Sequence, residues 1–203
     1  FDAAIESYRA ALLIDPQLVS AQAALGKALQ AKGSLQDALQ AYNDGLQLSP
    51  NNVALLNLKA GLLEALQQYR DAADVYQSVL AIEKDQVFAL NNLAMLLIDH
   101  FPNEKNFARA LQLTNNFEDT NIAVLLDTRG WVYYQMKDYL SAKRILKRAV
   151  DADGDESVFR FHLGMTYYKL EDKVAAKIEL EKSLANDAIF VGSDEASELV
   201  KKL

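Results

Sequence analysis

Apolar residues along the chain recur at helical spacing, in segments that come in pairs. Residues 19–33 predict one helix, in which small Gly26 permits close contact with a neighbouring helix. Residues 35–48 predict a second helix, separated from the first by the breaker Gly33 and ended by Pro50. The apolar positions that define the two stripes are Leu25 and Leu29, then Leu35, Ala38, Leu39, Tyr42 and Leu46. The pattern therefore predicts a helix–turn–helix unit.

This unit repeats along the chain. An alanine followed four residues later by an aromatic or apolar residue recurs at steps of 34, 34, 38, 32 and 34 residues. The series is Ala4/Tyr8, Ala38/Tyr42, Ala72/Tyr76, Ala110 (with Thr114 in the aromatic place), Ala142/Leu146 and Ala176/Leu180. A second series of small residues has nearly the same period: Gly26, Ala60, Ala94, Gly130 and Gly164. A fixed period of this length is typical of stacked repeat proteins.

These markers resemble the tetratricopeptide repeat (TPR) family, whose pattern is W-x₂-L-G-x₂-Y…A-x₃-F…P with a period of 34 residues. Repeat 19–52 matches with Leu25-Gly26-x₂-Leu29, Ala38-x₃-Tyr42 and Pro50, and repeat 157–190 matches with Leu163-Gly164-x₂-Tyr167 and Ala176-x₃-Leu180. The resemblance implies an all-α, right-handed α-solenoid of helix–turn–helix units over residues 1–203. We place its parts at 1–18 (the second helix of a truncated repeat), 19–52, 53–86, 87–122, 123–156 and 157–190, with a capping helix at 193–203.

Two features depart from a regular array. The stretch 99–106 lengthens the turn inside the fourth unit by about four residues relative to the 34-residue period, and we expect it to loop out on one face. Residues 1–15 carry no partner helix, so we expect an open apolar face there and a solenoid that continues upstream of Phe1. The apolar stripe of 193–203 predicts that the array ends at this helix.

Composition narrows the function classes. Of 203 residues, 21 are Lys or Arg and 28 are Asp or Glu, which gives a net charge of -7 and disfavours general nucleic-acid binding. The absence of cysteine excludes disulfides, thiolate metal sites and cysteine nucleophiles. No apolar run approaches the length of a membrane span, so we expect no direct membrane insertion. The compartment stays open: a soluble protein, cytoplasmic or periplasmic if bacterial.

No catalytic or metal-binding motif emerges, so we expect neither an enzyme nor a cofactor or metal. Residues 151–155 resemble the start of a calcium loop, but Glu156 and His162 stand where an EF-hand requires Gly and Glu. A basic cluster, Lys143, Arg144, Lys147 and Arg148, is interpreted as a salt-bridged surface because acidic residues follow it; docking of an acidic partner or lipid headgroup is the alternative.

The resemblance implies a concave groove lined by the first helix of each repeat. Asn57, Asn91 and Asp127 occupy one position in successive repeats, where amide groups can hold the backbone of an extended peptide. Aromatic residues and methionine crowd the C-terminal half and are typical interface anchors. The candidate groove residues are Asn57, Asn91, Asn92, Met95, Asp127, Trp131, Tyr134, Phe161, His162 and Tyr168, with Lys27, Ala54, Leu58 and Phe88 at further groove positions. Ala23, Val124 and Thr128 replace the cations of the family's two-carboxylate clamp, which disfavours that subclass.

The expected function is therefore a protein–protein interaction module that binds an extended peptide or helix in its groove, as a scaffold or adaptor. Two alternatives stay open: a structural scaffold that self-associates through the open N-terminal face, or the regulatory TPR region of a larger protein. Segments such as 91–94, 126–131 and 161–164 also resemble the closing repeats of large bacterial TPR proteins, including lipoproteins of exopolysaccharide and exosortase systems. That narrower resemblance implies a role in a bacterial cell-envelope or secretion assembly.

Overall fold

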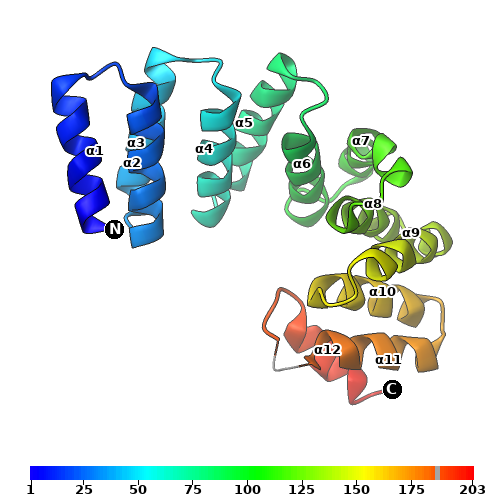
Figure 1. Ribbon diagram of the computed structural model, residues 1–203. Coiled ribbons are helices and arrows are strands. Elements are labelled where there is room, and N and C mark those ends of the chain that lie inside the picture. The colour runs from blue at the N-terminus through cyan, green and yellow to red at the C-terminus, as the bar shows by residue number, and fades with distance from the viewer. Residues whose placement is uncertain (186–187) are drawn as a thin grey trace. The chain divides into compact units, whose positions relative to one another are not determined.

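The computed structural model describes residues 1–185 and 188–203 as helices joined by short turns, with no strand in these ranges (Figure 1). Backbone contacts divide the chain into two compact units, 1–96 and 97–203, which are described separately below. The expected all-α class is confirmed. The expectation that residues 1–203 form a single uninterrupted solenoid stays a prediction.

The first unit is a succession of helix pairs. Its helices are α1 (Asp2–Ile14), α2 (Val19–Lys32), α3 (Leu35–Leu48), α4 (Val53–Ala65), α5 (Tyr69–Ile82) and α6 (Val87–Asp99), of which α6 runs across the boundary between the units. Helices α2, α4 and α6 begin at the first residue of an expected repeat. The sequence period therefore locates helix starts closely in this unit.

The second unit contains α7 (Glu104–Leu113), the 3₁₀ helix η1 (Asn115–Asp119), α8 (Ala123–Gln135), α9 (Tyr139–Ala152), α10 (Ser157–Lys169), α11 (Lys173–Ser183) and α12 (Ser193–Val200). The starts of α8 and α10 again coincide with expected repeat starts. Helix α12 packs against α11 and buries Ala196 and Leu199, and its role as the capping helix of the array stays a prediction.

Each helix pair is held by a small residue facing a large one. Gly26 on α2 meets the ring of Tyr42 on α3, so closely that any side chain at position 26 would overlap the ring. The phenol group of Tyr42 then donates a hydrogen bond to Gln30 Oε1 at 3.1 Å. In the next pair, buried Tyr76 donates to Glu64 Oε1 at 2.6 Å. The periodic markers are thus packing residues whose polar ends are satisfied inside the pair.

The turn inside each regular pair requires one residue in the left-handed region. Gly33 has this conformation with φ 86°, and Gln67, Lys137 and Glu171 have it with φ values of 58°, 65° and 61°. Gly33 and Gln67 are one 34-residue period apart, as are Lys137 and Glu171. Only glycine adopts this region without cost, so three of the four turns carry modest backbone strain.

The prediction that the stretch 99–106 forms a loop is wrong, because residues 104–106 are helical. Helix α6 ends at Asp99 and α7 already begins at Glu104, so most of the extra residues extend the start of α7. The reason is a local cap: Asn103 Oδ1 accepts the backbone N–H of Asn106 at 3.0 Å, which starts the helix early. The irregularity is instead visible after α7, where η1 replaces the end of the second helix.

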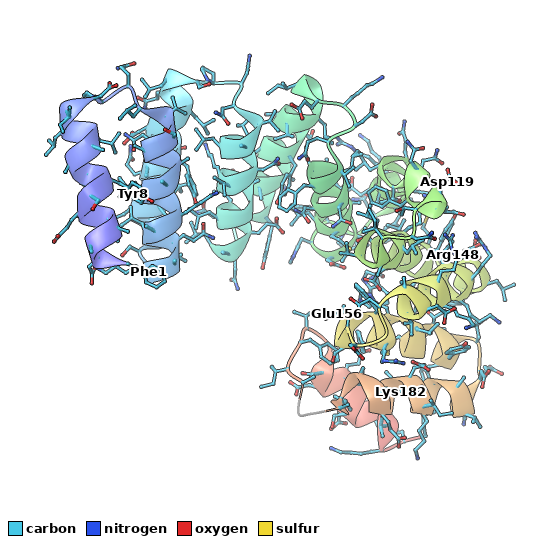
Figure 2. All side chains as sticks on the ribbon, in the orientation of Figure 1. Phe1, Tyr8, Asp119, Arg148, Glu156 and Lys182 are labelled. Atoms are coloured by element: carbon cyan, nitrogen blue, oxygen red, sulfur yellow. The ribbon has the colours of Figure 1, made fainter. Side chains whose placement is uncertain are left out.

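Arginine side chains hold η1 in place. Arg129 and Arg144 contact the two oxygens of Glu118 at 3.1 and 3.0 Å, and Tyr133 donates to the same carboxylate at 2.6 Å. Arg148 donates to the backbone oxygens of Glu118 and Thr120 at 2.8 and 2.9 Å. Figure 2 labels Arg148 on α9 and Asp119 at the end of η1.

These contacts confirm the interpretation of the basic cluster as a salt-bridged surface for Arg144 and Lys147, whereas Arg148 binds backbone carbonyls. Arg144 and Arg148 bind Glu118 of the η1 segment through its carboxylate and its backbone carbonyl, respectively. Lys147 forms an ion pair with Asp151 at 3.2 Å. Burial works against the charge of Glu118, but the hydrogen bonds from Tyr133, Arg144 and Arg129 outweigh it and lower the pKa of Glu118 to about 2. The cluster thus stabilises the irregular repeat.

Candidate functional site

The first helices of three consecutive repeats line a pocket in the first unit. Its volume is about 260 Å³, and its walls come from α2, α4 and the start of α6. The lining residues are Lys27, Ala54, Asn57, Leu58, Gln86 and Phe88. Five of these six stand at positions that the sequence assigned to the groove. The pocket therefore lies on the face where the repeat pattern places a ligand.

Two polar atoms on this face are buried without a partner. Asn57 Oδ1 and Asn91 Oδ1 are shielded from solvent, yet neither accepts a hydrogen bond from a donor in the described part of the chain. The orientation of Asn91 is set by its own amide group, which donates to Asn92 Oδ1 at 3.2 Å. A buried acceptor left unsatisfied costs about 1–3 kcal/mol. These two oxygens are therefore the polar groups of this face that the described part of the chain leaves unsatisfied.

Asn92 has a different role from the one expected. Its amide donates to Tyr76 Oη at 3.2 Å, and its oxygen receives the bond from Asn91. Asn92 therefore links the groove surface to the buried tyrosine and orients Asn91. Burial, together with the hydrogen bond to Glu64, raises the pKa of Tyr76, which keeps its hydroxyl protonated. Met95 is half-buried on the same helix.

Lys27 and Gln86 line the pocket, and Gly61 lies on α4 near Asn57. Lys27 is exposed at its rim and forms no ion pair with any residue in 1–185 or 188–203. Gln86 uses its Oε1 to accept the N–H of Ala89 at 2.6 Å and so begins α6. It was missed by the sequence reasoning, although a polar residue just before a predicted helix is a typical capping signal. Gly61 lies on α4 one turn after Asn57, with nothing within 4 Å of the place where its Cβ would stand.

In the second unit, the residue equivalent to Asn57 and Asn91 is Asp127, and its side chain is already bound within the unit. Asp127 and His162 are buried with 4 % and 5 % exposure, and His162 Nδ1 lies 2.9 and 3.0 Å from the two oxygens of Asp127. The prediction that Asp127 contacts a ligand is therefore wrong, because both of its carboxylate oxygens lie within hydrogen-bond distance of an imidazole from the next repeat. His162 as a groove residue is wrong for the same reason.

The expected aromatic anchors pack mostly on one another. Trp131 stacks on His162 with ring centroids 3.9 Å apart and on Tyr134 at 4.3 Å. Phe161 is buried against Phe190 at 5.5 Å, so its expected role as an exposed anchor is wrong. Trp131 and Tyr134 are half-buried in this cluster. Tyr168 alone among the five expected aromatic and imidazole side chains of this unit is exposed, at 38 %.

The carboxylate of Asp99 contacts the edge of this aromatic cluster. Trp131 Nε1 donates to Asp99 Oδ1 at 3.3 Å. Burial around the carboxyl group raises the pKa of Asp99, while the hydrogen bond from Trp131 and the nearby imidazoles of His162 and His100 act in the opposite direction. The two orphaned amides of the first unit have no counterpart in this arrangement. The candidate binding surface is therefore the pocket and the two asparagines of the first unit.

The acidic residues form no candidate metal site. Within residues 1–185 and 188–203, no group of three or more His, Asp or Glu side chains is arranged to hold a metal ion. The turn at 151–155, tested above as a calcium loop, instead binds Arg160, which contacts the carbonyl of Gly154 at 2.5 Å and Glu179 at 2.7 Å.

Comparison with family models decides the assignment. A model described as "Tetratricopeptide repeat" matches residues 1–53 and 23–87, and a second model with the same description matches 124–156. Together these ranges cover more than half of the chain. The chain belongs to the tetratricopeptide repeat family. No curated protein sequence gives a significant match.

Solved structures share the TPR solenoid fold. The TPR protein TTC0263 from Thermus thermophilus has a TM-score of 0.71 at 18% identity, with 90% of this chain and 99% of that chain covered. MamA from Desulfovibrio magneticus RS-1 has a TM-score of 0.68 at 18% identity, covering 91% and 96%. YrrB, described as a TPR protein with an unusual peptide-binding site, has a TM-score of 0.67 at 16% identity, covering 98% and 100%.

Membrane insertion has no support among the helices of the TPR chain. None of those formed by residues 1–185 and 188–203 combines the length and apolar character that a bilayer crossing requires.

Proposed function

We propose that the chain is a peptide-binding scaffold module, whose recognition surface is the first-helix face of the first unit. It binds an extended segment of a protein partner. Asn57 Oδ1 and Asn91 Oδ1 accept backbone N–H groups of the ligand, while Leu58 and Phe88 contact an apolar side chain. No step of bond making or breaking is assigned to it.

The single observation that carries this proposal is the pair of buried, unpartnered amide oxygens. A folded protein satisfies nearly all of its buried polar groups, so two orphans in equivalent repeat positions need an explanation. Their spacing by 34 residues places them in successive repeats. An extended peptide presents N–H groups at regular intervals and is suited to bridge such positions.

The family and the solved structures are consistent with this proposal. TPR proteins generally act as protein-interaction scaffolds. Among the similar structures, YrrB is described as having a peptide-binding site and PilW as a type IV pilus biogenesis factor. The resemblance of the C-terminal repeats to bacterial envelope TPR proteins gives a second, narrower hypothesis about where such a scaffold acts.

The test is selection of a displayed library of linear peptides on the intact chain. We expect wild type to enrich a peptide class whose affinity falls at least tenfold in Asn57→Leu and in Asn91→Leu. The matched control is Asn43→Leu, the same substitution in a larger depression of about 370 Å³ formed by α3, α4 and α5. Peptides that bind all variants equally, or that lose affinity only in Asn43→Leu, contradict the proposal.

A second candidate is self-association through α1. Leu13 and Ile14 on this helix are exposed at 85 % and 88 %, and Tyr8 is only half-buried. The equivalent Tyr42 is completely buried beneath its partner helix, so α1 presents a face that can receive another helix. Leu13→Ser/Ile14→Ser distinguishes this candidate: it leaves peptide binding unchanged and reduces any association that uses α1.

A further inference from the structure

An apolar segment near the C-terminus is exposed to solvent in an unusual way. Ile189 and Val191 have exposures of 95 % and 94 %, the highest among the large apolar residues described. Between them, Phe190 packs against buried Phe161. Ile189 and Phe190 have no regular secondary structure, and Val191 begins a turn that the bond from Ser193 N–H to the Phe190 carbonyl closes at 3.1 Å. The segment therefore presents two apolar side chains while its middle residue anchors it.

Two backbone N–H groups of this segment lack an acceptor in the described part of the chain. The N–H groups of Ile189 and Val191 make no hydrogen bond to an acceptor within residues 1–185 and 188–203. Asp194 and Glu195 follow on the first turn of α12, so the segment runs directly into two acidic side chains. An exposed segment whose backbone N–H groups lack acceptors in the described chain can donate to a surface that offers acceptors.

These features complement the pocket of the first unit. The pocket offers the unsatisfied acceptor Asn57 Oδ1, apolar walls at Leu58 and Phe88, and at its rim Lys27, which forms no ion pair within residues 1–185 and 188–203. The second unsatisfied acceptor, Asn91 Oδ1, follows on α6, outside the lining of the pocket. We propose that the ligand of this pocket is residues 188–195 of a second copy of the chain. Ile189 or Val191 enters the apolar part, the N–H groups bind Asn57 and Asn91, and Asp194 or Glu195 meets Lys27. This inference rests on the proposed function of the pocket.

The geometry of such an association is head-to-tail. Donor segment and acceptor pocket are different surfaces of one chain, so each copy offers one of each, and contact of two copies leaves one donor and one acceptor unused. The contact is small, so association is weak and depends on concentration. The expected products are short linear assemblies that lengthen as protein concentration rises.

Complementary mixing tests the proposal. The donor variant is Ile189→Ser/Val191→Ser, and the acceptor variant is Asn57→Leu. Wild type should rise in mass above 22.6 kDa with concentration, while each variant alone stays at that mass. An equimolar mixture of the two variants should form a complex of twice that mass and go no further, because it retains one intact donor and one intact acceptor. Sedimentation equilibrium measures all three.

The control is Val174→Ser/Ile178→Ser on α11, which removes two other exposed apolar side chains and should associate as wild type does. The proposal is overturned if wild type stays monomeric up to about 1 mM, the concentration range of a weak complex. It is also overturned if the donor variant associates as strongly as wild type, or if the mixture of variants stays monomeric.

Failure of this inference is separable from failure of the proposed function. If library peptides bind wild type and are lost in Asn57→Leu while the chain stays at 22.6 kDa, the pocket binds peptides but not its own C-terminal segment. If no peptide class depends on Asn57, the pocket itself is wrongly assigned.

Discussion

The two units use the same repeat position in opposite ways. Asn57 in the first unit and Asp127 in the second each stand fifth in their repeat. Asp127 is closed off because His162, sixth in the following repeat, reaches back and binds both of its oxygens. The residue in the corresponding place after Asn57 is Asn92, whose amide is already occupied by Tyr76. What a repeat position does is therefore decided by the side chain that the next repeat supplies.

The largest effect expected from this difference is at Asp127. Asp127→Leu leaves His162 buried without its acceptor, so we expect the second unit to lose about 2–4 kcal/mol of unfolding free energy. Trp131 is the only tryptophan and stacks on His162, so its fluorescence during urea unfolding reports this unit directly. An unchanged urea midpoint would show that the Asp127–His162 pair contributes nothing to stability.

Acid sensitivity of the second unit is the next prediction. The pKa of Glu118 is lowered from its ordinary 4.5 to about 2, so its contribution is fully present above pH 4.5 and is lost as pH falls toward 2. Its side chain is 26 % exposed, and after allowance for solvent screening we expect Glu118→Gln to cost about 1–2 kcal/mol at pH 7. Urea unfolding of both proteins at pH 7 and near pH 2 should show this difference shrinking. The control is Glu198→Gln, whose side chain on α12 is 65 % exposed and for which no such change is expected.

Leucine at the equivalent position of the first unit should have the opposite effect to Asp127→Leu. Asn57→Leu removes a buried acceptor that has no partner, so we expect a gain of up to about 1 kcal/mol in unfolding free energy. Thermal unfolding by circular dichroism measures it. A loss as large as that of Asp127→Leu would mean that Asn57 is already satisfied inside the unit, and the contrast between the units would fail.

A substitution at Gly61 tests whether the first unit keeps open space on α4 for a ligand. Glycine inside a helix costs about 1 kcal/mol relative to alanine, and the space around its missing Cβ is open. Gly61→Ala should therefore stabilise the chain by about 0.5–1 kcal/mol. If the open space serves a ligand that lies close to α4, the same variant should bind enriched peptides less tightly. Stabilisation with unchanged peptide affinity would show that Gly61 has no part in recognition.

The smallest effect is expected at a turn. Glu171 has φ 61°, and Glu171→Gly relieves this strain at the cost of a more flexible unfolded chain. We expect a net gain of about 0.5 kcal/mol, measured by urea unfolding. The matched control is Lys177→Gly, which lies in the interior of α11 and should destabilise.

The sequence predicted the fold through its packing residues. The periodic alanines and glycines locate the helices because only small residues fit where two helices meet, and Gly26 against Tyr42 shows this directly. The irregular repeat was predicted less well. Period alone shows that residues are added between Ala94 and Ala110, but not that Asn103 would cap an early helix instead of leaving a loop.

The candidate site was predicted only in part. Carrying groove positions from one repeat to the next placed Asn57 on α4 and Asn91 on α6, and their role in binding stays a prediction. It failed for Asp127, Phe161 and His162, because the periodic pattern treats every repeat alike. The pairing of Asp127 with His162 depends on two residues that stand 35 apart, a relation that appears only when the repeats are stacked.

The left-handed residue at each regular turn has a consequence for how such a protein grows. Gly33 and Gln67 both have a left-handed backbone conformation and stand one period apart. The segment between them is therefore a repeat cassette that begins and ends in the same turn geometry. Duplication or deletion of that cassette preserves the turn geometry on both sides. Lineages carrying this protein are therefore expected to differ in length by whole multiples of the repeat, with shorter insertions confined to the stretch around Asn103.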